Sequence, residues 1–77
     1  MILSIDQSTS ATKGLIWDYN GCLLGRADIA HRQITNDRGW VEHDPIEILN
    51  NTYKAAKNAL TAANVNPAKI NVIGISN

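Results

Sequence analysis

Short apolar segments separated by polar turns predict three strands in the first half of the chain. Apolar residues predominate in Ile2 to Ile5 and in Lys13 to Asp18, and Cys22 to Ile34 alternates imperfectly between apolar and polar residues. Asn20-Gly21 follows the second segment, and this dipeptide supplies the positive φ angles that a tight hairpin requires. The pattern is typical of an antiparallel meander.

A helix is predicted from Asp44 onward. Asp44 can accept a backbone hydrogen bond as N-cap, and Pro45 suits the first helical position because an N–H there would have no partner within the helix. The side chain of Glu47, three residues after the cap, can reach back to it. Beyond the cap, apolar residues recur at spacings of three and four, namely Ile46, Leu49, Tyr53, Ala56, Leu60 and Ala63. Because these positions share one face of a helix, we expect them to be the buried face.

The remainder of the chain completes an α/β fold. Asn64 is a candidate left-handed helix end, Asn66-Pro67 can open a short turn, and Ile70 to Ser76 reads as a strand, whereas Thr35 to His43 lacks periodicity and is expected to be a loop. The order is therefore β-β-β-α-β. A helical crossover places the last strand parallel to the first, with right-handed connectivity, and gives a mixed sheet.

Composition excludes several classes of protein. The 77 residues carry seven basic and seven acidic side chains, which is not the footprint of a nucleic-acid binder or a polybasic membrane patch. The chain lacks the run of about 18 apolar residues that a membrane helix needs, and its start lacks a signal-peptide pattern. Cys22 is the one cysteine, so no internal disulfide forms. We therefore expect a cytoplasmic protein.

The segment between the first two strands is the strongest candidate for chemistry. The first strand ends at Asp6, a turn follows, and Lys13 opens the return strand. The turn offers the hydroxyl groups of Ser8, Thr9, Ser10 and Thr12. Hydroxyls and backbone N–H groups can donate to phosphate oxygens, lysine adds positive charge, and a carboxylate can hold hydrated magnesium. The alternative is an ordinary polar hairpin turn with an incidental acid.

A second candidate is the segment Gly39 to Pro45, where an aromatic residue, acids and a histidine occur together. The structural interpretation is favoured here. The cap already explains Asp44 and Pro45, Trp40 fits a hydrophobic staple or core plug, and a lone histidine seldom marks a ligand site. His31 receives the same interpretation.

Three motifs in this order resemble the amino-terminal end of the FGGY carbohydrate kinases, most closely the glycerol kinases of that family. They are Ile5-Asp6-Gln7-Ser8-Thr9-Ser10, Gly39-Trp40-Val41-Glu42-His43-Asp44-Pro45 and Ile73-Gly74-Ile75-Ser76-Asn77. The resemblance implies a ribonuclease-H-like fold related to actin, with MgATP and substrate held between two such domains. It also implies that residues 1–77 are the amino-terminal, incomplete part of the first kinase domain.

The resemblance assigns roles to individual residues. Asp6 takes the place of the family aspartate near hydrated Mg²⁺, Thr9 and Ser10 take the places of the hydroxyl residues of the first phosphate loop, and Lys13 that of a basic residue facing the ATP phosphates. Ser8 stands in the same loop where the family usually has glycine. Lys13 replaces the usual arginine, so a point charge stands in place of a bidentate fork. No catalytic residue is assigned within this chain, because the general base and the substrate contacts come after Asn77.

The resemblance therefore implies an ATP-dependent kinase that phosphorylates a hydroxyl of a small polyol or sugar, with glycerol favoured and Mg²⁺ as cofactor. Xylulose-type and ribulose-type kinases are the alternatives within the family, and a non-catalytic packing or assembly module is the alternative outside it. The 77-residue chain alone is expected to be inactive. We also expect a homo-oligomer, with self-association through the apolar edge at Ile70 to Ser76.

Overall fold

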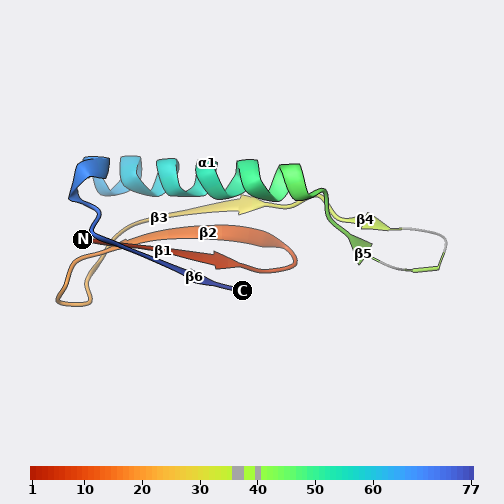
Figure 1. The fold of residues 1–77 in the computed structure, drawn as a ribbon, viewed down its shortest axis with the longest axis horizontal. Helices are drawn as coiled ribbons and strands as arrows, with labels where there is room; N and C mark the ends of the chain where they lie inside the picture. Colours follow the sequence, from red (N-terminus) through yellow and green to blue (C-terminus); the bar gives the residue numbers. More distant parts are fainter. Residues whose placement is uncertain (36–37, 40) are drawn as a thin grey trace.

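Four strands form one mixed sheet in a computed structural model that describes residues 1–35, 38–39 and 41–77. Strand β1 (Ile2–Gln7) pairs antiparallel with β2 (Ala11–Trp17), and β2 pairs antiparallel with β3 (Leu23–Ala30). Strand β6 (Val72–Ser76) lies parallel to β1, which gives the order β3-β2-β1-β6 (Figure 1). The meander, the crossover and the mixed sheet are confirmed.

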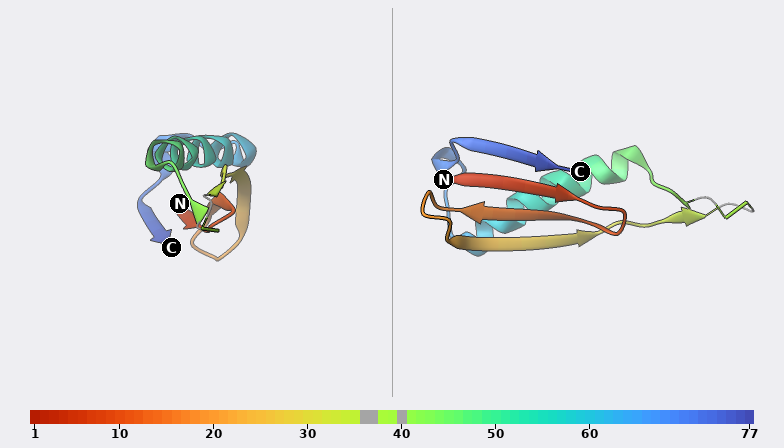
Figure 2. Two further views of the ribbon diagram at one scale, coloured as in Figure 1. Left: turned by 90° about the vertical axis from the view of Figure 1, so that its right-hand side faces the viewer. Right: turned by 90° about the horizontal axis from the view of Figure 1, so that it is seen from below.

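One long helix, α1 (Pro45–Ala63), lies across one face of this sheet, and a single turn of 3₁₀ helix, η1 (Pro67–Lys69), leads into β6 (Figure 2). The expected loop before α1 contains two short strands, β4 (Ile34–Thr35) and β5 (Val41–Glu42), which pair antiparallel. The prediction of a loop throughout this segment was therefore wrong. Trp40 and its expected staple lie outside the described residues.

Both ends of α1 are capped as local chemistry predicts, with one exception. The carboxylate of Asp44 accepts a hydrogen bond from the Ile46 N–H at 2.9 Å, and Asn64 adopts a left-handed conformation with φ 54°. The predicted return of Glu47 to the cap is wrong. Its carboxylate instead accepts the Arg32 N–H at 2.8 Å and lies 3.8 Å from the guanidinium of the same residue. Glu47 thus ties the start of α1 to the chain that follows β3.

The hairpin turn between β2 and β3 also differs from the prediction in its backbone. Gly21 has a φ of 83°, but Asn20 does not have the positive φ that the expected two-residue turn requires. The Asp18 carboxylate instead accepts the N–H groups of Asn20 and Cys22, each at 2.9 Å. A carboxylate that caps the turn in this way favours a longer turn, in which glycine alone needs the left-handed region.

The buried face of α1 is not the predicted apolar stripe. Ala55 and Ala59 are fully buried, whereas Ile46, Leu49 and Tyr53 are 62%, 50% and 69% exposed. The second half of the predicted stripe is correct, since Ala56, Leu60 and Ala63 pack against the core of Leu3, Ile5, Ile16 and Ala59. The helix is therefore rotated so that its small residues face the sheet and its large early residues do not.

Two strand glycines explain this rotation. A Cβ atom at Gly14 would lie 2.6 Å from the carbonyl oxygen of Ala55, and one at Gly25 would lie 2.5 Å from the backbone nitrogen of Ala63. Glycine in a strand interior often marks the close approach of another backbone. The backbone of α1 rests on β2 and β3 at these two points, and a larger side chain at the contact would push it away.

Strand β6 is an edge strand whose outward row of backbone groups has no described neighbour. Its Val72, Ile73 and Ile75 are 50%, 63% and 71% exposed, and it carries no charged side chain. The opposite edge, β3, carries Arg26 and Asp28 instead. Charged side chains discourage edge-to-edge pairing, so β6 is the edge open to association.

We expect the 77-residue chain to self-associate through β6. Replacing both Ile73 and Ile75 with lysine should raise the dissociation constant of the self-associated species by about tenfold or more. The change removes two exposed apolar side chains and adds repulsion between like charges. Sedimentation equilibrium measures this, with Leu24→Lys on the opposite edge as the control. A monomeric wild-type chain at high concentration contradicts the prediction.

Candidate phosphate-binding site

The turn between β1 and β2 brings the five predicted site residues into one hairpin. The register pairs Asp6 with Lys13, which places their side chains on the same face of the sheet, directly across from each other. Ser8, Thr9 and Ser10 form the turn between these strands, and all three are exposed. The sequence prediction that these groups lie together is therefore consistent with the fold.

Asp6 and Lys13 face away from α1. Alternation along β2 buries Thr12, Gly14 and Ile16 beneath the helix and leaves Lys13 on the other face, which we call the open face. The register extends this polar row to both sides, with Ser76 of β6 opposite Asp6 and Asp28 of β3 opposite Lys13. A row of alternating hydroxyl, acidic and basic groups thus crosses all four strands at one level.

The two carboxylates in this row, Asp6 and Asp28, have different surroundings. Arg26 donates two hydrogen bonds to Asp28, at 2.8 and 2.9 Å, and these lower the pKa of the Asp28 carboxyl, with a smaller contribution from the positive charge of Lys13. The negative charge of Asp28 is therefore already paired with Arg26. Asp6 is exposed beside a hollow of about 460 Å³ that is lined by residues of β1 and β6 and by Leu15 of β2.

The turn itself is internally braced. The Ser8 N–H donates to the Ala11 carbonyl at 2.9 Å, the Ser8 hydroxyl donates to the same carbonyl at 3.1 Å, and the Ala11 N–H returns a bond to that hydroxyl at 3.3 Å. Ser8 therefore shapes the turn. Thr9 and Ser10 form its exposed tip, with a further contact of 3.4 Å between the Ser8 and Ser10 hydroxyls. The hydroxyls at the tip can be offered to a ligand.

The sequence analysis gave both histidines a structural interpretation but missed that the fold brings them to this turn. The ring nitrogen Nε2 of His43 lies 2.7 Å from the Thr9 carbonyl oxygen, and the His31 N–H donates to the Ser10 carbonyl at 2.8 Å. The two rings stand edge to face with centroids 5.8 Å apart. His43 was visible in the sequence only as the residue before the helix cap, and His31 only as the end of a strand, so neither spacing indicated the turn.

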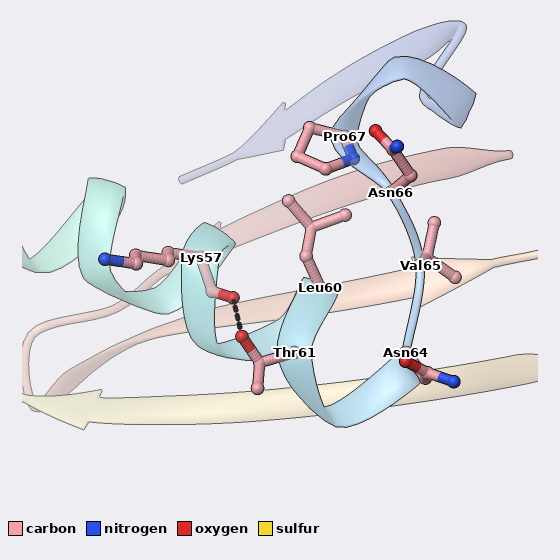
Figure 3. Close-up of a pocket in the computed structure, with 7 residues that line it drawn as sticks. All are labelled: Lys57, Leu60, Thr61, Asn64, Val65, Asn66 and Pro67. Carbon is pink, nitrogen blue, oxygen red and sulfur yellow. Dashed lines mark hydrogen bonds between the residues drawn. The ribbon is translucent and has the colours of Figure 1, made fainter.

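A larger hollow in the described part of the chain lies elsewhere. It has a volume of about 660 Å³ and is formed at the far end of α1, where the helix turns toward η1 (Figure 3). Its lining consists of Lys57, Leu60, Thr61, Asn64, Val65, Asn66 and Pro67. Lys57 is the single ionisable group among these residues, and the candidate turn formed by Ser8, Thr9 and Ser10 is at the opposite end of the helix. We therefore assign the candidate site to the turn and not to this hollow.

No helix in the described residues is both long and apolar enough to cross a membrane. Likewise, no group of three or more metal-binding side chains occurs in residues 1–35, 38–39 and 41–77.

The four-stranded mixed sheet and its crossover helix have the arrangement of the first part of an actin-like ATPase fold. The sequence profile of the N-terminal domain of the FGGY family of carbohydrate kinases matches residues 1–77. The chain belongs to the FGGY family of carbohydrate kinases.

Individual relatives agree with this assignment. Glycerol kinase 1 of Thermotoga maritima is 41% identical over 76 residues, which are 99% of this chain and 15% of that protein. Glycerol kinase of Rhizorhabdus wittichii is 43% identical over 74 residues, covering 96% of this chain and 14% of its own length. A crystal structure of Plasmodium falciparum glycerol kinase with ADP matches with a TM-score of 0.74 and 35% identity, over 96% of this chain and 14% of that one. The chain thus spans about one seventh of these relatives.

Proposed function

We propose that residues 1–77 are the amino-terminal, incomplete part of the first domain of an ATP-dependent kinase. The reaction is transfer of the γ-phosphoryl group of ATP to a hydroxyl of a small polyol or sugar, and glycerol is the favoured substrate. The observation that supports this most directly is the pairing of Asp6 with Lys13 beside an exposed hydroxyl turn, in a member of a carbohydrate kinase family. Glycerol is favoured because the relatives described above are glycerol kinases.

The residues of the turn fit the task of holding polyphosphate. Thr9 and Ser10 present hydroxyl groups at the exposed tip, and Lys13 supplies a positive charge on the open face. Ser8 contributes by bracing the turn through Ala11. Phosphoryl transfer depends mostly on positioning and on stabilising negative charge, so these groups supply what the first half of such a site needs.

Asp6 fits a role beside hydrated Mg²⁺. Its carboxylate is exposed at the end of β1 and borders the open-face hollow, and one carboxylate with several waters suits this ion. When bound, Mg²⁺ neutralises charge on the ATP phosphates. Asp6 would hold the hydrated ion, Lys13 would hold a phosphate oxygen, and the turn would fix the position of both.

The other half of the site belongs to the longer protein. We assign the general base and the substrate contacts to segments outside residues 1–77, in line with the one-seventh share of the relatives that this chain spans. We place the longer kinase in the cytoplasm and propose that it is a homo-oligomer. The exposed apolar residues Ile46, Leu49 and Tyr53 of α1, with Ile73 and Ile75 of β6, support further packing around this unit.

The assignment is tested by a coupled ADP-release assay on the longer protein. We expect MgATP-dependent turnover with glycerol, and a lower kcat/KM with xylulose and ribulose. We expect no turnover from the 77-residue chain, since one phosphate-binding turn lacks the opposing half of the site. A higher kcat/KM for a ketose than for glycerol would change the proposed substrate but not the proposed reaction. Absence of phosphoryl transfer from the longer protein to every polyol and sugar tested would favour a non-catalytic module.

A further inference from the structure

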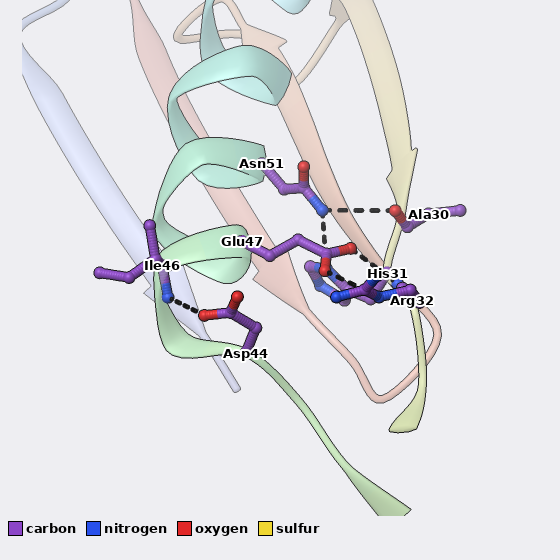
Figure 4. Close-up of polar contacts among 7 residues, drawn as sticks. All are labelled: Ala30, His31, Arg32, Asp44, Ile46, Glu47 and Asn51. Atoms are coloured by element: carbon purple, nitrogen blue, oxygen red, sulfur yellow. Dashed lines mark hydrogen bonds and ion pairs between the residues drawn. The ribbon is translucent and has the colours of Figure 1, made fainter. Parts of the chain in front are cut away.

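His31 and His43 contact the candidate turn (Ser8, Thr9 and Ser10) from the side on which α1 lies. Buried Thr12 of β2 has its hydroxyl 2.8 Å from Nε2 of His31, and Nδ1 of that ring lies 3.0 Å from the amide nitrogen of Asn51 on α1 (Figure 4). His43 precedes the helix directly and borders a hollow of about 210 Å³ together with Thr9 and Ile48. Asp6 and Lys13 are on the other face of the sheet, so the histidines do not compete with them for a ligand.

The neighbours of His31 determine where its proton sits. The Asn51 amide nitrogen donates one hydrogen to the Ala30 carbonyl at 3.3 Å, which fixes the orientation of the amide, and its second hydrogen points to Nδ1 of His31. Nδ1 therefore accepts, so the proton is on Nε2 and is donated to the Thr12 hydroxyl. This chain of bonds joins α1, the end of β3 and β2, and it fixes the backbone of His31, whose N–H holds the Ser10 carbonyl.

The bond from His43 has a simpler assignment and a direct consequence for the turn. The Thr9 carbonyl can only accept, so Nε2 of His43 must carry a proton and donate it. The C=O and N–H groups of a trans peptide point in opposite directions, and the described backbone has no cis peptide. Holding the Thr9 carbonyl toward His43 therefore aims the Ser10 N–H away from His43.

We propose that His43, backed by His31, is a positioning residue that fixes the Thr9–Ser10 peptide so that the Ser10 N–H donates to an ATP phosphate oxygen. This inference rests on the proposed function, since it assumes that phosphate binds on the open face. Without the His43 bond, the Thr9–Ser10 peptide can flip and present a carbonyl oxygen to the phosphate, which repels it. Neither histidine touches the reacting atoms.

A matched pair of variants separates hydrogen bonding from packing. His43→Phe keeps an aromatic ring that can stand edge to face with His31 but has no donor, whereas His43→Gln supplies an N–H that can reach the Thr9 carbonyl. In the longer kinase we expect His43→Phe to raise the KM for MgATP about 3- to 10-fold, the equivalent of one lost hydrogen bond. We expect His43→Gln to stay within about twofold of wild type, and the KM for the polyol to be unchanged in both variants.

A second readout uses the 77-residue chain and does not depend on catalysis. In ¹H–¹⁵N spectra we expect His43→Phe to shift or broaden the Ser10 amide signal, while His43→Gln preserves it and signals from the middle of α1 stay unchanged in both. Identical behaviour of the two variants, in KM and in the Ser10 signal, would overturn the inference. If wild-type protein transfers no phosphoryl group, the proposed function fails, and the Ser10 signal alone then decides whether His43 positions the turn.

Discussion

Replacing Asp6 with alanine in the longer kinase is expected to lower kcat roughly 100-fold, with a much smaller effect on the KM for the polyol. Carboxylates that orient a metal ion or its waters typically contribute 10- to 100-fold to activity, and Asp6 is an exposed carboxylate two residues before Ser8 of the turn. The polyol KM should change little because Asp6 is assigned to the nucleotide side of the site. Steady-state kinetics with saturating MgATP and Mg²⁺ measure both quantities.

Asp28 provides the matched control for Asp6. It lies in the same polar row on the other side of Lys13, and it too is an exposed carboxylate on the open face. However, its charge is engaged by Arg26, and it lies one strand further from β1 than Lys13. We expect Asp28→Asn to leave kcat within about twofold of wild type, since surface ion pairs contribute little. A wild-type kcat for Asp6→Ala, or equal losses at both positions, would contradict the assignment.

The four strands of the mixed sheet, the helix and their order were predictable because their signals are local, whereas the short strands β4 and β5 were missed. The two helix caps at Asp44 and Asn64 are fixed by side-chain chemistry within a few residues, and the structure has both. The candidate turn was also predictable, because Asp6 and Lys13 flank it in the sequence and a hairpin necessarily brings its two strands together. Local chemistry therefore predicted the order of the elements and the grouping of the candidate residues, whereas the ribonuclease-H-like fold class came from the family resemblance.

The rotation of α1 and the histidine contacts were not predictable, because both depend on elements distant in the sequence. Apolar periodicity favours large side chains at a helix–sheet contact, but Gly14 and Gly25 let the backbone of α1 approach so closely that only alanine fits. In the same way, His31 reaches the turn through the pairing of β2 with β3, and His43 reaches it through the placement of α1. The signal in the sequence for the rotation of α1 was the presence of one glycine in each of two adjacent strands, Gly14 and Gly25.

Gly25→Ala is expected to destabilise the chain by about 3 kcal/mol, which is a large part of a total stability on the order of 5 kcal/mol. The added Cβ would lie 2.5 Å from the Ala63 nitrogen and 2.7 Å from the Ala59 carbonyl oxygen. These are backbone atoms within a hydrogen-bonded helix, so they cannot rotate away as a flexible side chain would. The helix must therefore lift from β3, which also loosens the burial of Ala59 in the core.

Gly74→Ala is the control that separates this clash from the general effect of removing a glycine. Gly74 lies in β6 with no atom within 4 Å of its added Cβ and without a positive φ, so alanine there meets neither steric nor backbone strain. Urea unfolding followed by circular dichroism should show that Gly74→Ala changes the free energy of unfolding by less than about 1 kcal/mol, because its main effect is to lower the entropy of the unfolded chain. Similar midpoints for both variants would mean that α1 does not rest on β3 through Gly25, and the close backbone contact would then not be the reason why the large apolar residues of α1 are exposed.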